Sequence, residues 1–200
     1  MRIIKALQHA YYRNFDPKER YHITSGENYT WFRIAKNGTR SVLRMLQSAN
    51  TPINDSSYVK YVKNQHDEKF KFAVIRNPWD RVVSCYCDKV QGKLLFKECW
   101  DKDFAYFVGF LQRQNLDNCD RHIMRQSKLF PVKDIDYIAK LENLNHEIKF
   151  IADKINIEAE LIHKNKSKRA SYQTYYNDHL KQVVEGLFQD DIRLGSYSYE

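Results

Sequence analysis

Three short apolar segments, each followed by a polar turn and a helical pattern, constrain this chain more than any other feature. They cover residues 29–34, 70–75 and 136–141, and the middle one, "FKFAVI", is almost entirely apolar. Such a run suits a buried strand of a parallel sheet that has helices on both sides. Strands that alternate with helices therefore predict an α/β fold with a central, mostly parallel sheet flanked by helices.

The helical patterns that follow these segments cover residues 39–49, from Pro78 to about Val90, and 144–155. A proline is well suited to the first turn of a helix, because its missing N–H would be unpaired there anyway. The apolar residues of the last helix share one face: Ile148, Ile151, Ala152 and Ile155.

The rest of the chain gives weaker patterns. We expect a helix at 103–113 and a long helix at about 172–190. Residues 1–15 favour a short helix, 16–27 a polar lead-in rich in turns, and 50–57 a loop.

The size and charge of the chain limit the possible functions. With 200 residues it can bury roughly two thirds of its unfolded surface, so we expect one domain over residues 1–200. Lys and Arg outnumber Asp and Glu by 33 to 25, a net charge of +8. This surplus suggests an anionic partner, but charge does not choose among nucleic acid, lipid, a phosphorylated cofactor and an acidic glycan. The four cysteines contain no C-x-x-C pair, so we expect reduced thiols.

No segment of the sequence has the length and apolar character of a membrane span. The apolar runs near the start contain only two or three residues, too few for a signal peptide. On this basis we predict a cytoplasmic protein.

Two unusual polar segments follow predicted strands, where open α/β sheets bind their ligands. In the first, "AKNGTRS" at 35–41, the N–H groups from Gly38 to Ser41 would begin a helix and could bind an anion. Thr39 adds a hydroxyl, and Lys36 could reach a phosphate or a bridging oxygen. The alternative for this segment alone is a capped helix with a surface lysine.

The second segment, "RNPWDRVVS" at 76–84, begins with an arginine that ends a buried strand. Arg76 needs a partner there, because an unpaired buried charge is very costly. A guanidinium with the hydroxyl of Ser84, about two helical turns further on, suits a phosphate monoester. The alternative is a structural ion pair of Asp80 with Arg76 or Arg81.

Together the two segments resemble those with which carbohydrate sulfotransferases bind 3′-phosphoadenosine 5′-phosphosulfate (PAPS). "IAKNGTRS" is similar to the 5′-phosphosulfate loop, usually P-K-x-G-x-T-S, and "VIRNPWDRVVSCY" to the 3′-phosphate segment, usually R-[DN]-P-x-x-R-x-x-S-x-Y. The matching positions are Lys36, Gly38, Thr39 and Ser41 in the first, and Arg76, Pro78, Arg81, Ser84 and Tyr86 in the second.

The resemblance extends to a branch of this family, sulfotransferase family 2 of the chondroitin and HNK-1 type. "HIMRQS" at 122–127 and "DYIAKLENL" at 136–144 look like segments of that branch. The family-like core covers 29–199, after a lead-in of 1–27. The resemblance implies a P-loop-like three-layer sandwich, and the missing anchor implies a bacterial member. Departures from the usual motifs are Ala35 for proline, Arg40 for threonine and Arg125 for proline.

The resemblance also implies a mechanism. A sulfuryl group would pass in line from PAPS to a carbohydrate hydroxyl, leaving 3′,5′-ADP and requiring no metal. Lys36 would neutralise the bridging oxygen, while Arg76 and Ser84 would hold the 3′-phosphate. The other implied cofactor contacts are Asn37, Gly38, Thr39, Arg40, Ser41, Ser167, Lys168, Arg169 and Tyr172. For the basic stretch that contains Ser167 to Arg169, a solvated loop is the alternative.

The sequence does not decide which of two histidines is the general base. Histidine is the usual base near neutral pH. His122 lies in the family-like "HIMRQS" segment, and His66 precedes the second predicted strand, where a related branch places its base.

Two other functions compete with this interpretation. An ATP-dependent kinase is disfavoured because the motif G-x-x-x-x-G-K-[ST] is missing. A non-catalytic basic module for nucleic acid or acidic glycan would explain the charge, but not two polar loops placed after strands. We therefore expect an enzyme with a carbohydrate acceptor and no nucleic-acid partner.

Overall fold

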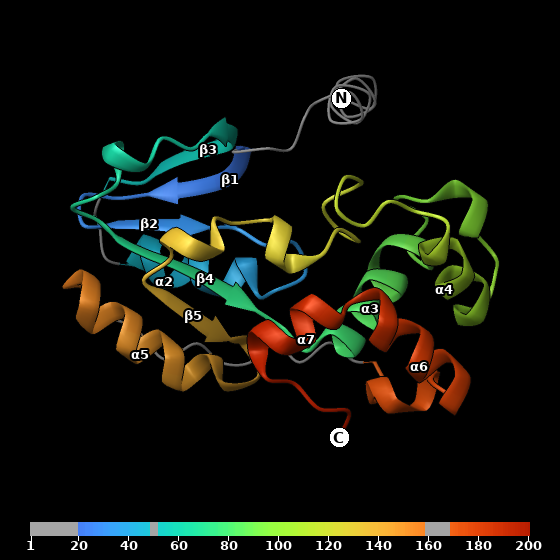
Figure 1. Cartoon of the computed structure of the whole chain (residues 1–200). Coiled ribbons are helices and arrows are strands. Elements are labelled where there is room, and N and C mark those ends of the chain that lie inside the picture. Colours follow the sequence, from blue (N-terminus) through green and yellow to red (C-terminus); the bar gives the residue numbers. More distant parts are fainter. Residues whose placement is uncertain (1–19, 49–51, 159–168) are drawn as a thin grey trace.

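The computed structural model describes residues 20–48, 52–158 and 169–200 of this chain. A five-stranded sheet lies at one side of the molecule and a group of helices at the other (Figure 1). The sheet has the strand order β3-β1-β2-β4-β5. The strands are β1 (Arg20–Ser25), β2 (Tyr29–Phe32), β3 (Asn54–Lys60), β4 (Phe70–Ile75) and β5 (Tyr137–Lys140). The α-helices are α2 (Thr39–Ser48), α3 (Pro78–Cys85), α4 (Phe104–Gln112), α5 (Leu144–Ile155), α6 (Asp178–Leu187) and α7 (Gln189–Gly195).

The described part also contains short helical segments. A π-helix, Tyr86–Val90, directly continues α3. The 3-10 turns are Lys63–Gln65, Lys97–Cys99, Gln126–Lys128, Val132–Asp134, Leu141–Asn143 and Tyr172–Tyr175.

The parallel part of the sheet was predicted correctly. β2 pairs with β4 in parallel, and β4 pairs with β5 in parallel. β4 therefore lies between two strands of the same direction, which explains why five of its six residues are buried. The loops that leave β2 and β4 emerge side by side at one edge of the sheet, because the two strands are adjacent and parallel.

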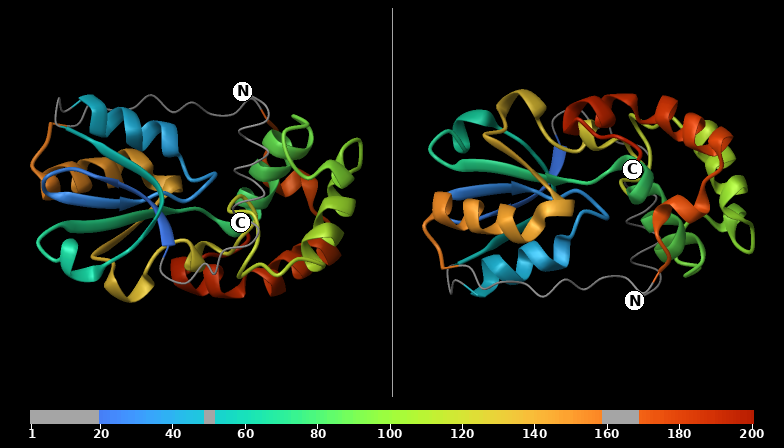
Figure 2. Two further views of the ribbon diagram at one scale, coloured as in Figure 1. Left: turned by 90° about the horizontal axis from the view of Figure 1, so that it is seen from above. Right: turned by 90° about the horizontal axis from the view of Figure 1, so that it is seen from below.

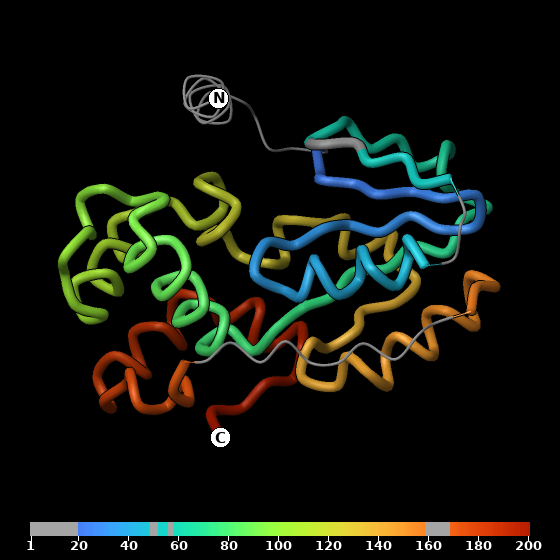
Figure 3. The backbone as a smooth tube through the Cα atoms, turned by 180° about the vertical axis from the view of Figure 1, so that it is seen from behind, coloured from blue at the N-terminus to red at the C-terminus, as the bar shows by residue number. Residues whose placement is uncertain are grey.

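Each face of the sheet has its own apolar cover. On one face, Trp31 and Phe72 pack with residues of α2 and α5 such as Met45 and Ile148. Seen from above and below, these two helices lie together on that side (Figure 2), and the view from behind shows α2 lying along the sheet (Figure 3). The opposite face is covered by residues of the segment 124–130 and by part of α7.

The two antiparallel strands correct the sequence prediction. β1 lies within the predicted turn-rich lead-in 16–27, and β3 begins in the middle of the predicted loop 50–57. Polar residues made both segments look like loops. Thr24 of β1 is buried, but its hydroxyl donates to Asp55 of β3 at 3.1 Å, so it is satisfied inside the sheet. The sheet is therefore mixed, with β1 antiparallel to both of its neighbours.

The predicted long helix 172–190 is wrong. The chain forms a short 3-10 turn and then the separate helices α6 and α7. The interruption follows from Asn177, whose side-chain oxygen accepts the N–H of Leu180 at 2.8 Å and starts α6. The helices predicted at 39–49, 103–113 and 144–155 are confirmed to within one residue at each described end. The helix predicted for residues 1–15 lies outside the described residues.

Candidate active site

The loop between β2 and α2 has an unusual backbone. Lys36 and Gly38 both have φ values of 73°, in the left-handed region that favours glycine. A Cβ atom added to Gly38 would lie 2.6 Å from Cδ1 of Leu141, at the end of β5. Gly38 thus lets the loop turn and also lets it pack closely against the 3-10 turn that follows β5. The N–H groups of Thr39 and Arg40 begin α2 without an acceptor in the preceding turn, whereas those of Ser41 and Val42 donate to the carbonyl oxygen of Gly38 at 2.9 and 3.1 Å.

The side chain of Lys36 is held over this loop by Asp88. Its Nζ atom lies 2.8 Å from Oδ2 of Asp88, which also lies 3.0 Å from Nζ of Lys89. Burial lowers the pKa of Lys36, although the Asp88 carboxylate opposes the change. Burial alone would raise the pKa of Asp88, but the two lysines bring it to about 2. Asp88 and Lys89 belong to the π-helix, a form of backbone that is frequent at functional sites.

Arg76 joins the second loop to the first. Its Nε and Nη2 atoms donate to Oδ2 of Asp80 at 2.8 and 2.6 Å, and its Nη1 donates to the carbonyl oxygen of Lys36 at 3.0 Å. The structural ion pair between Asp80 and Arg76, left open by the sequence, is thus present. Arg169 donates to the other carboxylate oxygen of Asp80. Two guanidinium groups therefore meet at one carboxylate beside the loop that contains Lys36.

The second loop is positioned by capping of α3. Asn77 is the N-cap, and its side-chain oxygen accepts the N–H of Trp79 at 3.1 Å, with Pro78 in the first turn. Ser84 is half-buried on α3, four residues after Asp80, so the two side chains share one helix face. Ser84 therefore lies on the same side of α3 as the guanidinium groups.

Arg81 is a structural clamp behind the site. It is 2% exposed, and it donates to the carbonyl oxygens of Ala35 at 3.2 Å, Met124 at 2.9 Å and Arg121 at 3.0 Å. Burial lowers its pKa. Ala35 and Arg121 directly precede Lys36 and His122. One guanidinium thus ties together the segments that carry Lys36 and His122, two of the three residues predicted to be catalytic.

Gln126 connects the two loops through a buried network. Its Oε1 accepts from Nδ2 of Asn37 at 2.6 Å and from the N–H of Arg76 at 2.9 Å, and its Nε2 donates to the carbonyl of Arg76 at 2.8 Å. Asp191 of α7 accepts the N–H groups of Gln126 and Ser127 at 2.7 and 2.9 Å. Asn37, predicted to contact the cofactor, is 1% exposed and points inward. The side chain of Asn37 therefore orders the loops rather than facing a ligand.

His122 lies on the Lys36 side of the sheet. Its Nδ1 is 2.7 Å from Oδ1 of Asp120, which leaves Nε2 as the nitrogen that could accept a proton. Burial lowers the pKa of His122, the Asp120 carboxylate opposes this, and the positive charge of Lys89 adds to the lowering. His122 is therefore neutral near pH 7, as a general base must be.

His66 lies elsewhere. Its Nδ1 is 2.8 Å from the hydroxyl of Thr30, near the start of β2, and its ring stacks on Tyr61 at 5.2 Å. The loop with Lys36 leaves the other end of β2, a four-residue strand that is about 10 Å long. Arg81 thus connects the segments that carry Lys36 and His122, whereas His66 contacts the other end of β2.

The other predicted cofactor contacts are spread around the first loop and the end of the chain. Thr39 donates to the carbonyl of Ile34 at 3.4 Å, Ser41 is half-buried, and Arg40 is exposed. Tyr172 donates to the carbonyl of Glu200 at 2.7 Å, and the charge of Asp80 adds to the rise of its pKa that burial causes. Ser167 and Lys168 lie outside the described residues.

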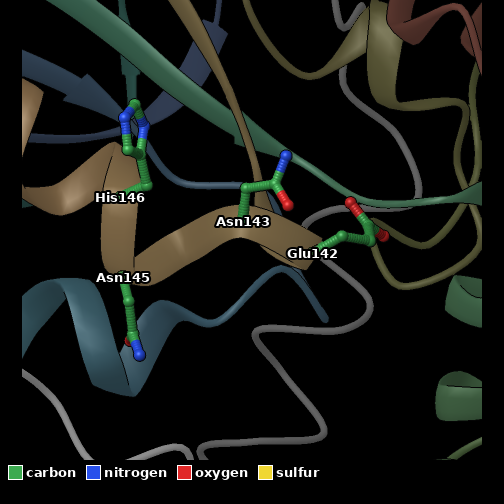
Figure 4. Close-up of a pocket in the computed structure, with 4 residues that line it drawn as sticks. All are labelled: Glu142, Asn143, Asn145 and His146. Atoms are coloured by element: carbon green, nitrogen blue, oxygen red, sulfur yellow. The ribbon is translucent and has the colours of Figure 1, made fainter.

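An open depression lies next to the second loop. It has a volume of about 380 Å³ and is lined by Glu142, Asn143, Asn145 and His146. Figure 4 shows Asn145 and His146 pointing to opposite sides at the start of α5. Glu142 accepts the N–H of Asn77 at 2.7 Å and the hydroxyl of Tyr197 at 3.1 Å, so it links this depression to the start of α3.

Sequence reasoning missed several residues that build the site. Asp88, Asp120 and Asp191 received no role, and Gln126 was noted only as part of a family-like segment. Charged residues are common, and nothing in their local spacing shows which cation or N–H group they meet. The one local signal was the segment "CDKV" directly after the second motif, since it places Asp88 one turn beyond Ser84.

The fold and the two loops define an α/β protein with a cationic site at the carboxyl edge of its parallel strands. The model of the sulfotransferase family matches residues 1–198. The chain therefore belongs to the sulfotransferase family and is a transferase that moves sulfuryl groups. No curated protein and no solved structure matched this chain.

Two further observations concern the described residues only. None of their helices is both long and apolar enough to cross a membrane. They also contain no group of three or more His, Cys, Asp or Glu side chains that could hold a metal ion.

Proposed function

We propose that this chain transfers the sulfuryl group of PAPS to a hydroxyl of a carbohydrate and releases 3′,5′-ADP. One observation carries the proposal: Arg76 donates to the carbonyl oxygen of Lys36, so the loops after β2 and β4 are in direct contact. The two loops carry the motifs that resemble the 5′-phosphosulfate and 3′-phosphate segments of carbohydrate sulfotransferases. Their direct contact supports a single nucleotide site.

The residues present fit a nucleotide with phosphate groups at two ends. At one end, the N–H groups of Thr39 and Arg40 at the start of α2 can bind an anion, with Lys36 close to them in the chain. At the other, Arg76 and Arg169 already share the carboxylate of Asp80, an anion of the kind that a phosphate would provide. Ser84 adds a hydroxyl on the same face of α3. PAPS supplies an activated sulfuryl group attached to its 5′-phosphate.

Each of the candidate catalytic residues then has a defined task. Lys36 places its ammonium group where negative charge develops on the leaving oxygen, and preorganised stabilisation of this kind usually contributes more to catalysis than any other effect. His122 accepts the proton of the acceptor hydroxyl at Nε2. Asp120 holds the Nδ1 proton and so fixes the tautomer that this task requires. Arg81 keeps the two catalytic segments at a constant separation.

The finer assignments follow the same reasoning. We assign the fold to the P-loop-like three-layer type, as a single domain over residues 1–200, because a strand, an anion-binding turn and a helix form its centre. The net charge of +8 supports an anionic partner. We propose a carbohydrate acceptor, transfer without a metal and a cytoplasmic location. For the branch of the family we retain the chondroitin and HNK-1 type, in a bacterial member.

A thermal shift experiment tests this function against its alternatives. 3′,5′-ADP should raise the Tm of the chain more than ATP with magnesium does, because only 3′,5′-ADP has a phosphate for Arg76 and Ser84. Stabilisation by ATP alone would support a kinase. If single-stranded DNA stabilises the chain equally, and added salt abolishes this stabilisation, the result would support a basic binding module. Transfer of labelled sulfate from PAPS to a panel of glycans then identifies the acceptor.

Replacing Arg76 by alanine should weaken the binding of 3′,5′-ADP by about 2 kcal/mol, as expected for a lost charge-assisted contact. Isothermal titration calorimetry measures this change. Arg113→Ala is the matched control, since Arg113 also pairs with a carboxylate but is 55% exposed at the end of α4, and it should leave the affinity unchanged. An unchanged affinity in Arg76→Ala would place the 3′-phosphate elsewhere.

The lowered pKa of His122 predicts the pH dependence of the reaction. The base must be neutral, so the acidic decline of kcat/KM should have its midpoint below 6.5, the usual pKa of histidine. Initial rates between about pH 4.5 and pH 8, a window chosen around that value, measure the profile. In His122→Ala the rates should be low and this acidic limb should disappear. A limb that survives in the variant would assign the base to another residue.

A further inference from the structure

Asp80 occupies a position that the proposed function does not explain. It stands in the second loop between two arginines that would bind the same phosphate, and its side chain is 20% exposed. A carboxylate beside a phosphate site is unfavourable by charge alone, because the two anions repel each other. Its presence there therefore needs a compensating role.

The contacts of Asp80 divide its two oxygens between the two arginines. Oδ2 accepts hydrogen bonds from both Nε and Nη2 of Arg76, and Oδ1 accepts one from Nη2 of Arg169. Asp80 and Arg169 are 89 residues apart in the chain. One carboxylate thus fixes two guanidinium groups that come from separate parts of the fold, and both side chains are largely buried, with 12% and 14% exposed.

Among the residues that the structure describes, these arginines form hydrogen bonds with only some of their donors. A guanidinium has five N–H donors. Within the described residues, Arg76 uses three of its donors, two for Asp80 and one for the carbonyl of Lys36. Arg169 uses one for Asp80. Two positive charges and one negative charge leave a net charge of +1 before a phosphate dianion arrives.

We infer that Asp80 is a positioning residue that joins Arg76 and Arg169 into one clamp specific for a nucleotide 3′-phosphate. This inference rests on the proposed function. An arginine side chain that is already oriented loses less conformational entropy when it binds an anion. Asp80 therefore increases the affinity for the 3′-phosphate although its own charge opposes that of the ligand.

The test compares two nucleotides that differ only in the 3′-phosphate, 3′,5′-ADP and 5′-AMP. In Asp80→Asn, the affinity for 3′,5′-ADP should fall on the order of tenfold, while the affinity for 5′-AMP should not change. A loss of general structure would weaken both nucleotides, so the ratio of the two affinities isolates the positioning role. Asp80→Glu should restore part of the preference. Asp190→Asn, which removes an exposed carboxylate from α7, is the control and should retain the full ratio.

A second variant keeps the inference testable if Asp80→Asn does not fold. Arg169→Ala leaves the pair of Arg76 and Asp80 intact and should also reduce the ratio. If both variants fold, Asp80→Asn should reduce the ratio of affinities less in the Arg169→Ala background than in the wild type, because one of the two arginines that Asp80 positions is already absent.

The outcomes separate the inference from the proposed function. If the wild-type chain does not prefer 3′,5′-ADP to 5′-AMP, the proposed 3′-phosphate site is wrong. If the wild type has this preference and Asp80→Asn keeps it, Asp80 does not position the clamp. Tighter binding of 3′,5′-ADP by Asp80→Asn would also overturn the inference, since the carboxylate would then compete with the phosphate.

Discussion

Replacing Lys36 by alanine is expected to lower kcat for sulfuryl transfer by about 10²- to 10³-fold, the usual effect of removing one preorganised donor from a transition state. The affinity for 3′,5′-ADP should change much less, because that product lacks the sulfuryl group and Lys36 acts on the oxygen that leaves it. Transfer rates at saturating PAPS and calorimetry with 3′,5′-ADP measure the two effects separately.

The control for this experiment is Lys63→Ala. Lys63 is also paired with an aspartate, at 3.0 Å, but its side chain is 65% exposed, and the pair lies on the β3–β4 connection. Its loss should leave kcat unchanged within the error of the assay. Full turnover in Lys36→Ala would remove Lys36 from the chemistry and leave it with a structural role in its pair with Asp88.

Replacing Arg81 by methionine should cost roughly 3 kcal/mol or more of unfolding free energy. Methionine fills a similar volume, but the carbonyl oxygens of Ala35, Arg121 and Met124 lose their donor inside the protein. Each buried acceptor left without a partner costs about 1–3 kcal/mol. Chemical denaturation monitored by circular dichroism measures the loss.

Arg113→Met is the matched control for Arg81→Met. Arg113 also donates to a backbone carbonyl and has a carboxylate partner, but its side chain is 55% exposed. Exposed ion pairs contribute little, so its loss should cost less than about 1 kcal/mol. Equal stability losses in the two variants would mean that the buried carbonyls find water or other donors. The role of Arg81 as a clamp would then be wrong.

The parallel centre of the fold could be predicted because its signals are local. "FKFAVI" is apolar enough to indicate a buried strand, and Pro78 marks the first turn of the helix that follows it. β1 and β3 could not be predicted in this way. Their polar residues are satisfied by partners on another strand, as Thr24 is by Asp55, and no local pattern contains that information.

The candidate site could be predicted in part for the same reason. Lys36, Gly38 and Arg76 stand in short motifs that directly follow strands, and the adjacency of β2 and β4 brings them together. Arg81 was found by its motif position, but its three carbonyl partners depend on how distant segments pack. The proposed preference for His122 over His66 also required the fold, because the contacts of Arg81 connect the His122 segment, and not His66, to the loop that contains Lys36.

The contact between Asp191 and Gln126 has a consequence for the synthesis of the protein. Asp191 follows Gln126 by 65 residues, which a ribosome adds in roughly 3 to 13 seconds at ordinary elongation rates. During that interval the nascent chain already carries both loops, but it lacks the carboxylate that orders the glutamine between them. The buried network that joins the two loops is therefore complete only after that interval.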